Sequence, residues 1–339
     1  LAGASVMIGR QGKISYLQTA GYADKEIAKP FTQDSVVRIF SMSKPITSVA
    51  AMMLYEQGCF QLDDPVAKYI PEFASTPVWR GGEASLSETE PQSSPMLVKH
   101  LLSHTSGLTY GFMQSNVVDQ EYRKEDIEFI NFKHSLAEIV TRLAKIPLIC
   151  QPGSQWNYSV STDVLGRLVE IWSGMRLAEF FQQRIFSPLQ MHDTDFQVKA
   201  ENQSRFSALY GPANGVDMSS VGKADLDLDK VEPRGLTLQE GSAKSRYFKS
   251  TMSDSGGGGL VGSIGDYGRF CQMLLNGGEL DGARLLSPTT VRYMRTNQLP
   301  NDCDMAAMGQ PVWSETSYDG IGFGLGFAVV LDPPKASII

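Results

Sequence analysis

The sequence predicts an α+β fold in which strands near both ends of the chain share a sheet and helices lie between them. Two β-type runs, residues 4–8 and 14–20, flank a short loop containing Gly12 and indicate a hairpin at the start of the chain. Helical patterns dominate the middle, and residues 322–333, GFGLGFAVVLDP, again have the composition of a strand.

The central element is a helix expected over residues 42–57. It follows a third strand candidate, SVVRIF at residues 35–40, and Gly58 stands where a glycine commonly ends a helix. Its apolar residues occupy most faces, which indicates burial in the middle of the protein. Residues 197–250 are polar and are expected to be irregular. Further helices are expected at residues 97–103 and at residues 161–172, the second of which ends near Gly174. A capping box of Ser135 and Glu138 precedes a helix expected at residues 136–145. A second capping box, Ser263 and Asp266, is expected to open another helix.

Composition sets the size of the core and excludes several classes of partner. The 339 residues are 42% hydrophobic, enough for a sizeable core, and no apolar run approaches the ~18 residues that span a bilayer. The net charge of −7 and the lack of a basic block argue against a nucleic-acid partner. Four widely spaced cysteines favour free thiols and a reducing, cytoplasmic location. Because no signal-peptide pattern follows Leu1, we expect such a leader to be absent or removed. The oligomeric state stays open.

Two histidines, His100 and His104, have a spacing that some metal sites use. Their segment, KHLLSHTSGL, lacks the glutamate of an H-E-x-x-H motif, and a metal would still need a third ligand. We therefore expect one or both of them to cap a helix end ahead of Gly107, and we expect no metal.

The segment RIFSMSKPITSVAAMML, residues 38–54, places Ser41 three residues before Lys44 at the start of the central helix. Residues three apart share a helix face, so Ser41 Oγ and Lys44 Nζ can meet. A serine hydroxyl needs an adjacent base to become a nucleophile, and a lysine can be that base when burial or a helix dipole lowers its proton affinity. The same dipole would stabilise an oxyanion beside Ser41.

The same spacing occurs at Ser220 and Lys223, but in an irregular stretch that no strand precedes, so we interpret that copy as chance. For Ser41 and Lys44 the residues alone leave two interpretations open. They form a catalytic pair, or Ser41 caps the helix while Lys44 extends toward solvent.

Five motifs occur in order along the chain: FSMSKPITSVAAMML, LDDPVAKYIPEF, VKHLLSHTSGLTY, PGSQWNYS and GGGGLVGSIGDYGRF. Together they resemble the serine β-lactamase-related family, which includes class C β-lactamases, DD-peptidases and, closest to this chain, family VIII carboxylesterases. The resemblance implies an antiparallel sheet flanked by helices, with a mostly helical subdomain and no cofactor. It also implies Ser41 as the nucleophile, Lys44 as its base and Tyr158 as the proton relay to the leaving group.

The chain departs from that family in two places. Where β-lactamases and DD-peptidases carry Asn two residues after the tyrosine, this chain has Val160, which cannot hydrogen-bond a substrate amide. The family's Lys/His/Trp-x-Gly strand should follow residues 322–333, and it does not occur between there and Ile339. We therefore expect the C-terminal part of the fold to lie outside this chain, together with the oxyanion donor that complements the Ser41 N–H. The edge of the first hairpin is then expected to be unpaired.

Three residues are expected at the substrate pocket: Tyr110, Val160 and Gly257. Gly257 lies in the run SGGGG at residues 255–259, which lacks the Gly-Lys-Ser/Thr of a phosphate loop and is expected to be a close backbone passage.

The sequence therefore predicts a serine hydrolase of small-molecule, short-acyl carboxylic esters. It forms one domain over residues 1–339, with sheet-bearing parts at about 1–60 and 255–339 and a helical or irregular subdomain at about 61–254. Hydrolysis of β-lactams or D-amino-acid peptides, acyl transfer to an alcohol or amine, and a non-catalytic binding protein remain alternatives.

Overall fold

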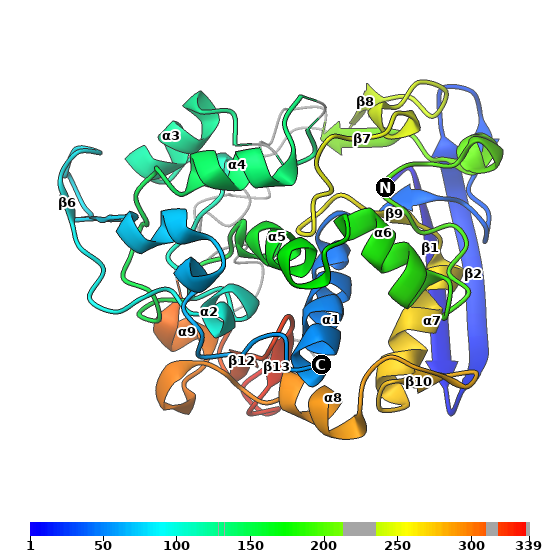
Figure 1. Ribbon diagram of the computed structural model, residues 1–339. Helices are drawn as coiled ribbons and strands as arrows, with labels where there is room; N and C mark the ends of the chain where they lie inside the picture. Colours follow the sequence, from blue (N-terminus) through cyan, green and yellow to red (C-terminus); the bar gives the residue numbers. More distant parts are fainter. Residues whose placement is uncertain (128, 132, 213–234, 310–317, 337–339) are drawn as a thin grey trace.

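The computed structural model describes residues 1–127, 129–131, 133–212, 235–309 and 318–336 (Figure 1). Its α-helices are α1 (Ser43–Glu56), α2 (Val98–Leu102), α3 (Val117–Lys124), α4 (Leu136–Leu143), α5 (Ser161–Ser173), α6 (Leu177–Phe181), α7 (Ile264–Leu275), α8 (Pro288–Met294) and α9 (Met305–Met308). Its strands are β1 (Gly3–Arg10), β2 (Lys13–Asp24), β3 (Lys29–Pro30), β4 (Val37–Arg38), β5 (Val78–Trp79), β6 (Thr89–Glu90), β7 (Leu209–Pro212), β8 (Leu236–Glu240), β9 (Val261–Gly262), β10 (Glu279–Leu280), β11 (Ala283–Arg284), β12 (Ile321–Phe323) and β13 (Ala328–Val330).

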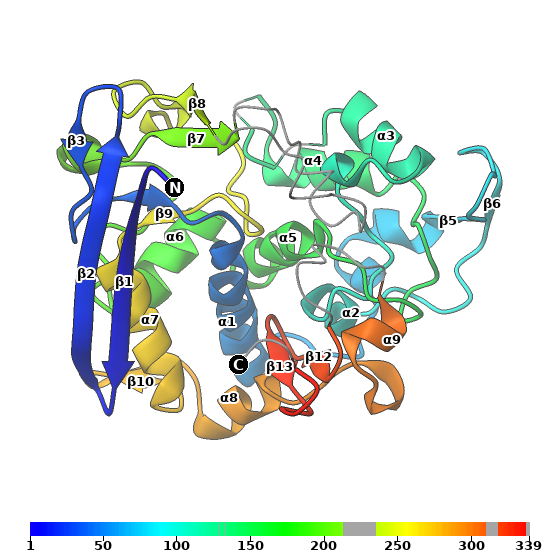
Figure 2. The ribbon, with the colours of Figure 1, turned by 180° about the vertical axis from the view of Figure 1, so that it is seen from behind.

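The hairpin at the start of the chain is confirmed. β1 and β2 pair antiparallel from Gly3 opposite Gly21 to Arg10 opposite Lys13, and β3 continues this sheet on the far side of β2. β1 is thus an edge strand among the described strands, as expected, and α7 packs against it (Figure 2).

The central helix is also confirmed, and it begins one residue later than predicted. α1 ends before Gly58, whose φ of +75° is the left-handed conformation that glycine adopts most readily. All nine residues from Ile46 to Leu54, together with Ser43 and Lys44, are buried, and α5 packs along the helix. In Figure 2, α1 lies between the first hairpin with α7 on one side and the β12–β13 hairpin on the other.

The expectation that strands from both ends share one sheet is wrong for the described residues. β12 and β13 pair with each other, so the run GFGLGFAVVLDP forms a hairpin rather than one strand. The reason is a reversal inside the run: Gly326 has a φ of +110°, and the Gly324 N–H donates to the Phe327 carbonyl at 2.9 Å. The early and late parts of the chain meet instead through the antiparallel pair β4–β9.

Other elements follow the sequence with local differences. Of the strand expected at residues 35–40, only β4 forms, because the chain turns at Phe40. Part of the region expected to be irregular is regular, since β7 and β8 form an antiparallel pair. The capping box of Ser135 and Glu138 is present in both directions. Among the described residues, we find no helix with the length and hydrophobicity that a membrane span requires.

Candidate active site

Ser41 lies on a sharp turn between β4 and α1. The Ile39 N–H donates to the Leu260 carbonyl at 3.0 Å and extends the β4–β9 pairing by one residue. Phe40 then adopts a φ of +42°, which a bulky non-glycine residue rarely does, and opens the 3-10 turn Phe40–Met42. The result is an exposed Ser41 at the surface end of a buried helix.

Lys44 lies one turn further on and is only 5% exposed. Its Nζ donates to Ser41 Oγ at 3.2 Å and to the Gly257 carbonyl at 2.6 Å. The spacing in the sequence therefore brings the serine and the lysine together, as expected. Lys44 is therefore not a solvent-extended side chain, and the N-cap position of α1 is Met42 rather than Ser41, so Ser41 does not cap this helix.

Two tyrosines flank the lysine. Lys44 Nζ lies 4.6 Å from the ring centroid of Tyr158 and 5.4 Å from that of Tyr110, within the range of cation–π contacts. The two rings lie 5.5 Å apart, and Tyr110 also stacks on Phe112 at 4.6 Å. Burial, followed by the nearby carboxyl of Asp163, raises the pKa of Tyr110 above its ordinary value. Tyr110 is therefore a neutral aromatic wall beside the lysine.

Of the three residues expected at the pocket, Tyr110 and Gly257 contact or face Lys44, whereas Val160 does not line an open site. Val160 is 2% exposed and belongs to the main hydrophobic core, and its N–H donates to the Thr109 carbonyl at 3.3 Å. The expectation for Val160 is corrected accordingly: it occupies the N-cap position of α5 and its side chain turns inward. Ser220 and Lys223 lie outside the described residues.

The glycine run is the close backbone passage that the sequence indicates. A Cβ on Gly257 would lie 2.3 Å from Asp163 Oδ2, and one on Gly256 would lie 2.9 Å from the Thr162 carbonyl oxygen. Asp163 was not recognised from the sequence. As the third residue of α5 it has the position of an ordinary carboxylate near a helix start, and nothing local indicates that it contacts residues more than ninety positions away.

Both histidines of the KHLLSHTSGL segment take part in capping. His100 Nδ1 accepts the Leu97 N–H at 3.2 Å at the start of α2, and His104 follows its end with a left-handed φ of +56°. Burial and then the positive charge of Lys44 lower the pKa of His104 to about 3, so its ring is neutral. No group of three metal-ligating side chains occurs among the described residues.

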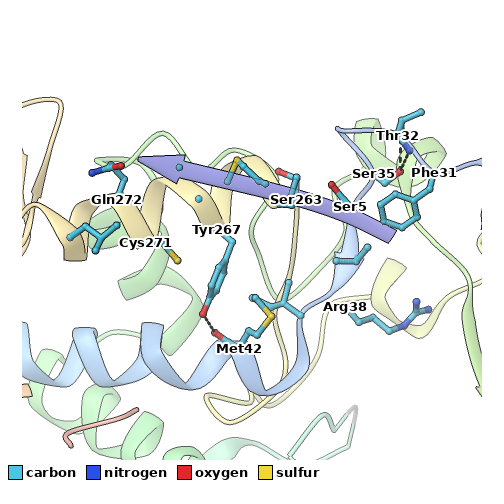
Figure 3. A pocket seen from close by; sticks show the side chains of 17 residues that line it. Ser5, Phe31, Thr32, Ser35, Arg38, Met42, Ser263, Tyr267, Cys271 and Gln272 are labelled. Carbon is cyan, nitrogen blue, oxygen red and sulfur yellow. Dashed lines mark hydrogen bonds between the residues drawn. The ribbon is translucent and has the colours of Figure 1, made fainter. Parts of the chain in front are cut away.

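A separate groove lies behind the serine turn, between β1, α7 and the start of α1 (Figure 3). Its volume is about 460 Å³, and it is lined by apolar residues such as Met7, Met42 and Leu275. Tyr267 closes one side and donates from its hydroxyl to the Met42 carbonyl at 3.2 Å. Ser41, Lys44 and Tyr158 are not among its lining residues, so this groove is distinct from the candidate active site.

An α+β fold in which an exposed serine is hydrogen-bonded to a buried lysine is the arrangement of one class of enzymes. These are serine enzymes that transfer acyl groups through an ester on the serine. The family model described as Beta-lactamase matches residues 1–335. The chain belongs to the β-lactamase family, and it is a serine hydrolase.

Individual relatives agree with this assignment. Esterase EstB of Burkholderia gladioli is 33% identical over 341 residues, covering 99% of this chain and 77% of EstB. The structure of EstCE1, a hydrolase with promiscuous acyltransferase activity, has a TM-score of 0.75 and 27% identity, covering 98% of this chain and 79% of EstCE1. Simvastatin synthase (LovD) from Aspergillus terreus shares the fold, with a TM-score of 0.74 at 24% identity over 98% of this chain and 79% of its own. The resemblance seen in the sequence motifs is confirmed.

Proposed function

We propose that this protein hydrolyses short-acyl carboxylic esters through an acyl-enzyme on Ser41. The observation that carries the proposal is the contact of the exposed Ser41 Oγ with the buried Lys44 Nζ at 3.2 Å. A hydroxyl that solvent can reach, next to a basic group that solvent cannot reach, is what a nucleophilic serine requires.

In the proposed reaction, neutral Lys44 takes the Ser41 proton as Oγ attacks the ester carbonyl carbon. The Ser41 N–H, close to the start of α1, stabilises the oxyanion of the tetrahedral intermediate. Collapse of that intermediate breaks the bond to the alcohol, and the proton passes through Tyr158 to the leaving alkoxide. Water then attacks the acyl group with the proton path reversed, which releases the carboxylic acid and restores Ser41.

Two observations favour esters over β-lactams and peptides. The relative EstB is an esterase by name. In addition, position 160 is a buried valine, so that this position offers no hydrogen-bond partner to a substrate amide. A lost hydrogen bond of this kind costs about 1–3 kcal/mol.

Acyl transfer is the second candidate. It differs from hydrolysis only in the acceptor: an alcohol replaces water in the attack on the acyl-enzyme. The description of EstCE1, which names a promiscuous acyltransferase activity, is the observation that favours it. Ester hydrolysis assayed with and without added short alcohols would show the transfer product directly.

The test compares p-nitrophenyl butyrate with a chromogenic cephalosporin, using the wild-type protein and three variants. We expect the ester to be turned over far faster than the cephalosporin. Ser41→Ala should abolish ester hydrolysis and labelling by a fluorophosphonate probe, and Lys44→Ala should approach the same loss, because residues that act as a unit are not additive. Ser220→Ala, the matched change in the second S-x-x-K, should leave activity intact. Unchanged hydrolysis in Ser41→Ala would overturn the proposal, and faster cephalosporin turnover would reassign the substrate class.

A further inference from the structure

The carboxylate of Asp163 lies at the centre of a polar network behind Lys44. Asp163 is 2% exposed, and its Oδ1 accepts hydrogen bonds from Ser255 Oγ at 2.6 Å and from the Gly257 N–H at 3.0 Å. Both donors come from the glycine run, whereas Asp163 belongs to the first turn of α5. The contact therefore ties α5 to the segment that holds the lysine.

The direction of each hydrogen bond in this network follows from the carboxylate. An ionised carboxylate only accepts, so the Ser255 hydroxyl must donate to it, and the Ser255 oxygen is then free to accept. It accepts the Gly258 N–H at 3.1 Å. That N–H belongs to the same peptide group as the Gly257 carbonyl, which accepts Lys44 Nζ at 2.6 Å. One carboxylate thus fixes the orientation of the peptide group that receives the lysine.

Packing leaves this peptide little freedom. A Cβ at position 257 would lie 2.3 Å from Asp163 Oδ2, so the carboxylate packs directly on the glycine. On the other side, Thr47 Oγ1 donates to the Gly256 carbonyl at 2.7 Å, which attaches the run to α1 one turn beyond Lys44. The segment is held from both helices.

We propose that Asp163 is a positioning residue for the reaction: through Ser255 and Gly257 it fixes where Lys44 Nζ is held. The inference rests on the proposed function, because it takes Lys44 as the base for Ser41. The other ionisable groups that face Lys44 are Tyr110 and Tyr158, whose rings lie beside Nζ, and His104, on whose pKa the lysine charge acts.

The positioning role of Asp163 can be separated by two substitutions that differ in shape. Asparagine keeps the shape of the side chain and an oxygen that can accept the Ser255 hydroxyl and the Gly257 N–H, whereas alanine removes the acceptor. If Asp163 acts by holding the peptide that receives Lys44, asparagine should retain most of the activity and alanine should not.

The experiment measures kcat and KM for p-nitrophenyl butyrate in Asp163→Asn, Asp163→Ala and Asp266→Asn. The last is a matched control, since Asp266 is also a buried carboxylate at the third residue of a helix, α7, and it contacts Asp193 and Thr194 rather than Lys44. We expect Asp163→Asn to keep kcat within about tenfold of the wild type, because its amide oxygen can still accept both hydrogen bonds. Asp163→Ala should lower kcat by about 10²-fold with little change in KM. Asp266→Asn should lose thermal stability while its kcat stays that of the wild type.

Wild-type kcat in Asp163→Ala, or a loss of kcat in Asp163→Asn as large as that in Asp163→Ala, would overturn the inference. If Asp163→Ala does not fold, Ser255→Ala decides, because it removes the link between Asp163 and the Gly258 N–H, and wild-type kcat there would overturn the inference. The rate at which a fluorophosphonate labels Ser41 provides a second readout, which should fall in Asp163→Ala and not in Asp163→Asn or Asp266→Asn. Failure of the proposed function is separate: it would appear as activity that survives Ser41→Ala, whatever the Asp163 variants do.

Discussion

The starts of α5 and α7 each carry a buried aspartate at the third residue of the helix. The Asp163 carboxylate accepts hydrogen bonds from the Ser255 hydroxyl and from the Gly257 N–H. The Asp266 carboxylate likewise accepts hydrogen bonds from the Thr194 hydroxyl at 2.8 Å and from the Asp193 N–H at 2.8 Å. Burial raises the pKa of both carboxyls above the ordinary value.

The two regions differ in what lies beyond the contacted segment. Behind Asp266, the carboxylate of Asp193 forms an ion pair with Arg205, which stabilises the fold at the surface. Behind Asp163, the Gly257 carbonyl holds Lys44. The same local arrangement thus has different long-range partners in the two regions. Substitutions that are matched between the two regions can separate a purely structural role from the proposed role at Lys44.

The largest effect is expected from adding a methyl group to a glycine in each region. In Gly257→Ala the new Cβ meets the fixed carboxylate of Asp163, so the peptide that holds Lys44 must move, and we expect kcat/KM for esters to fall by about 10²-fold or more. In Gly268→Ala, within α7, the new Cβ meets the flexible end of Met7 instead, and alanine is the better helix former by about 1 kcal/mol. Its kcat/KM should equal that of the wild type. If Gly257→Ala and Gly268→Ala both had the kcat/KM of the wild type, the position of the Gly257 peptide would not matter to the reaction.

The sequence anticipates the parts of this site that depend on neighbours in the chain. Ser41 and Lys44 meet because they are three residues apart, and the close approach at the SGGGG run follows from residues that have no side chain. Asp163 and Ser255 are 92 positions apart, and an aspartate in the first turn of a helix looks the same at α5 and α7. Only the tertiary packing distinguishes them.

The fold, too, can be predicted from the sequence only where the pattern is local. The first hairpin and α1 carry strong local patterns and were predicted, whereas the pairing of the late strands was not. Residues 322–333 have strand composition throughout, but the turn at Gly326 makes β12 and β13 pair with each other instead of joining the first sheet. The composition indicates that such residues are extended, and it does not indicate which strand they pair with.

A second, smaller effect concerns acid stability at the start of α5, where His104 Nδ1 and Ser159 Oγ are 3.3 Å apart. Because the pKa of His104 is lowered to about 3 in the folded protein, the unfolded chain binds a proton below the ordinary histidine pKa of 6.5 while the folded protein does not. His104 therefore contributes a loss of stability as the pH falls through that interval, up to about 1.4 kcal/mol per pH unit.

The measurement is denaturant unfolding at pH 7 and pH 4.5. His104→Asn, which tolerates the left-handed φ at this position, should lose less stability on acidification than the wild type, by about 2 kcal/mol. His192→Gln, at an exposed histidine, should keep the wild-type dependence. An undiminished acid sensitivity in His104→Asn would mean that the histidine is protonated without cost in the folded state.

The smallest effect is expected from removing one hydroxyl donor from each carboxylate. Ser255→Ala and Thr194→Val each delete the hydroxyl that donates to a buried aspartate, at 2.6 and 2.8 Å respectively, and Ser255→Ala also removes the acceptor of the Gly258 N–H. Both should lower the free energy of unfolding by about 1–3 kcal/mol. Only Ser255→Ala should also lower kcat/KM, and by no more than about tenfold, because the Gly257 N–H still reaches Asp163 and 1.36 kcal/mol corresponds to tenfold in rate. Paired measurements of unfolding and of ester hydrolysis on the two variants test this. A fall in kcat/KM of the same size in Thr194→Val would show that general loosening of the fold, rather than the hydrogen bond to Asp163, carries the effect on Lys44.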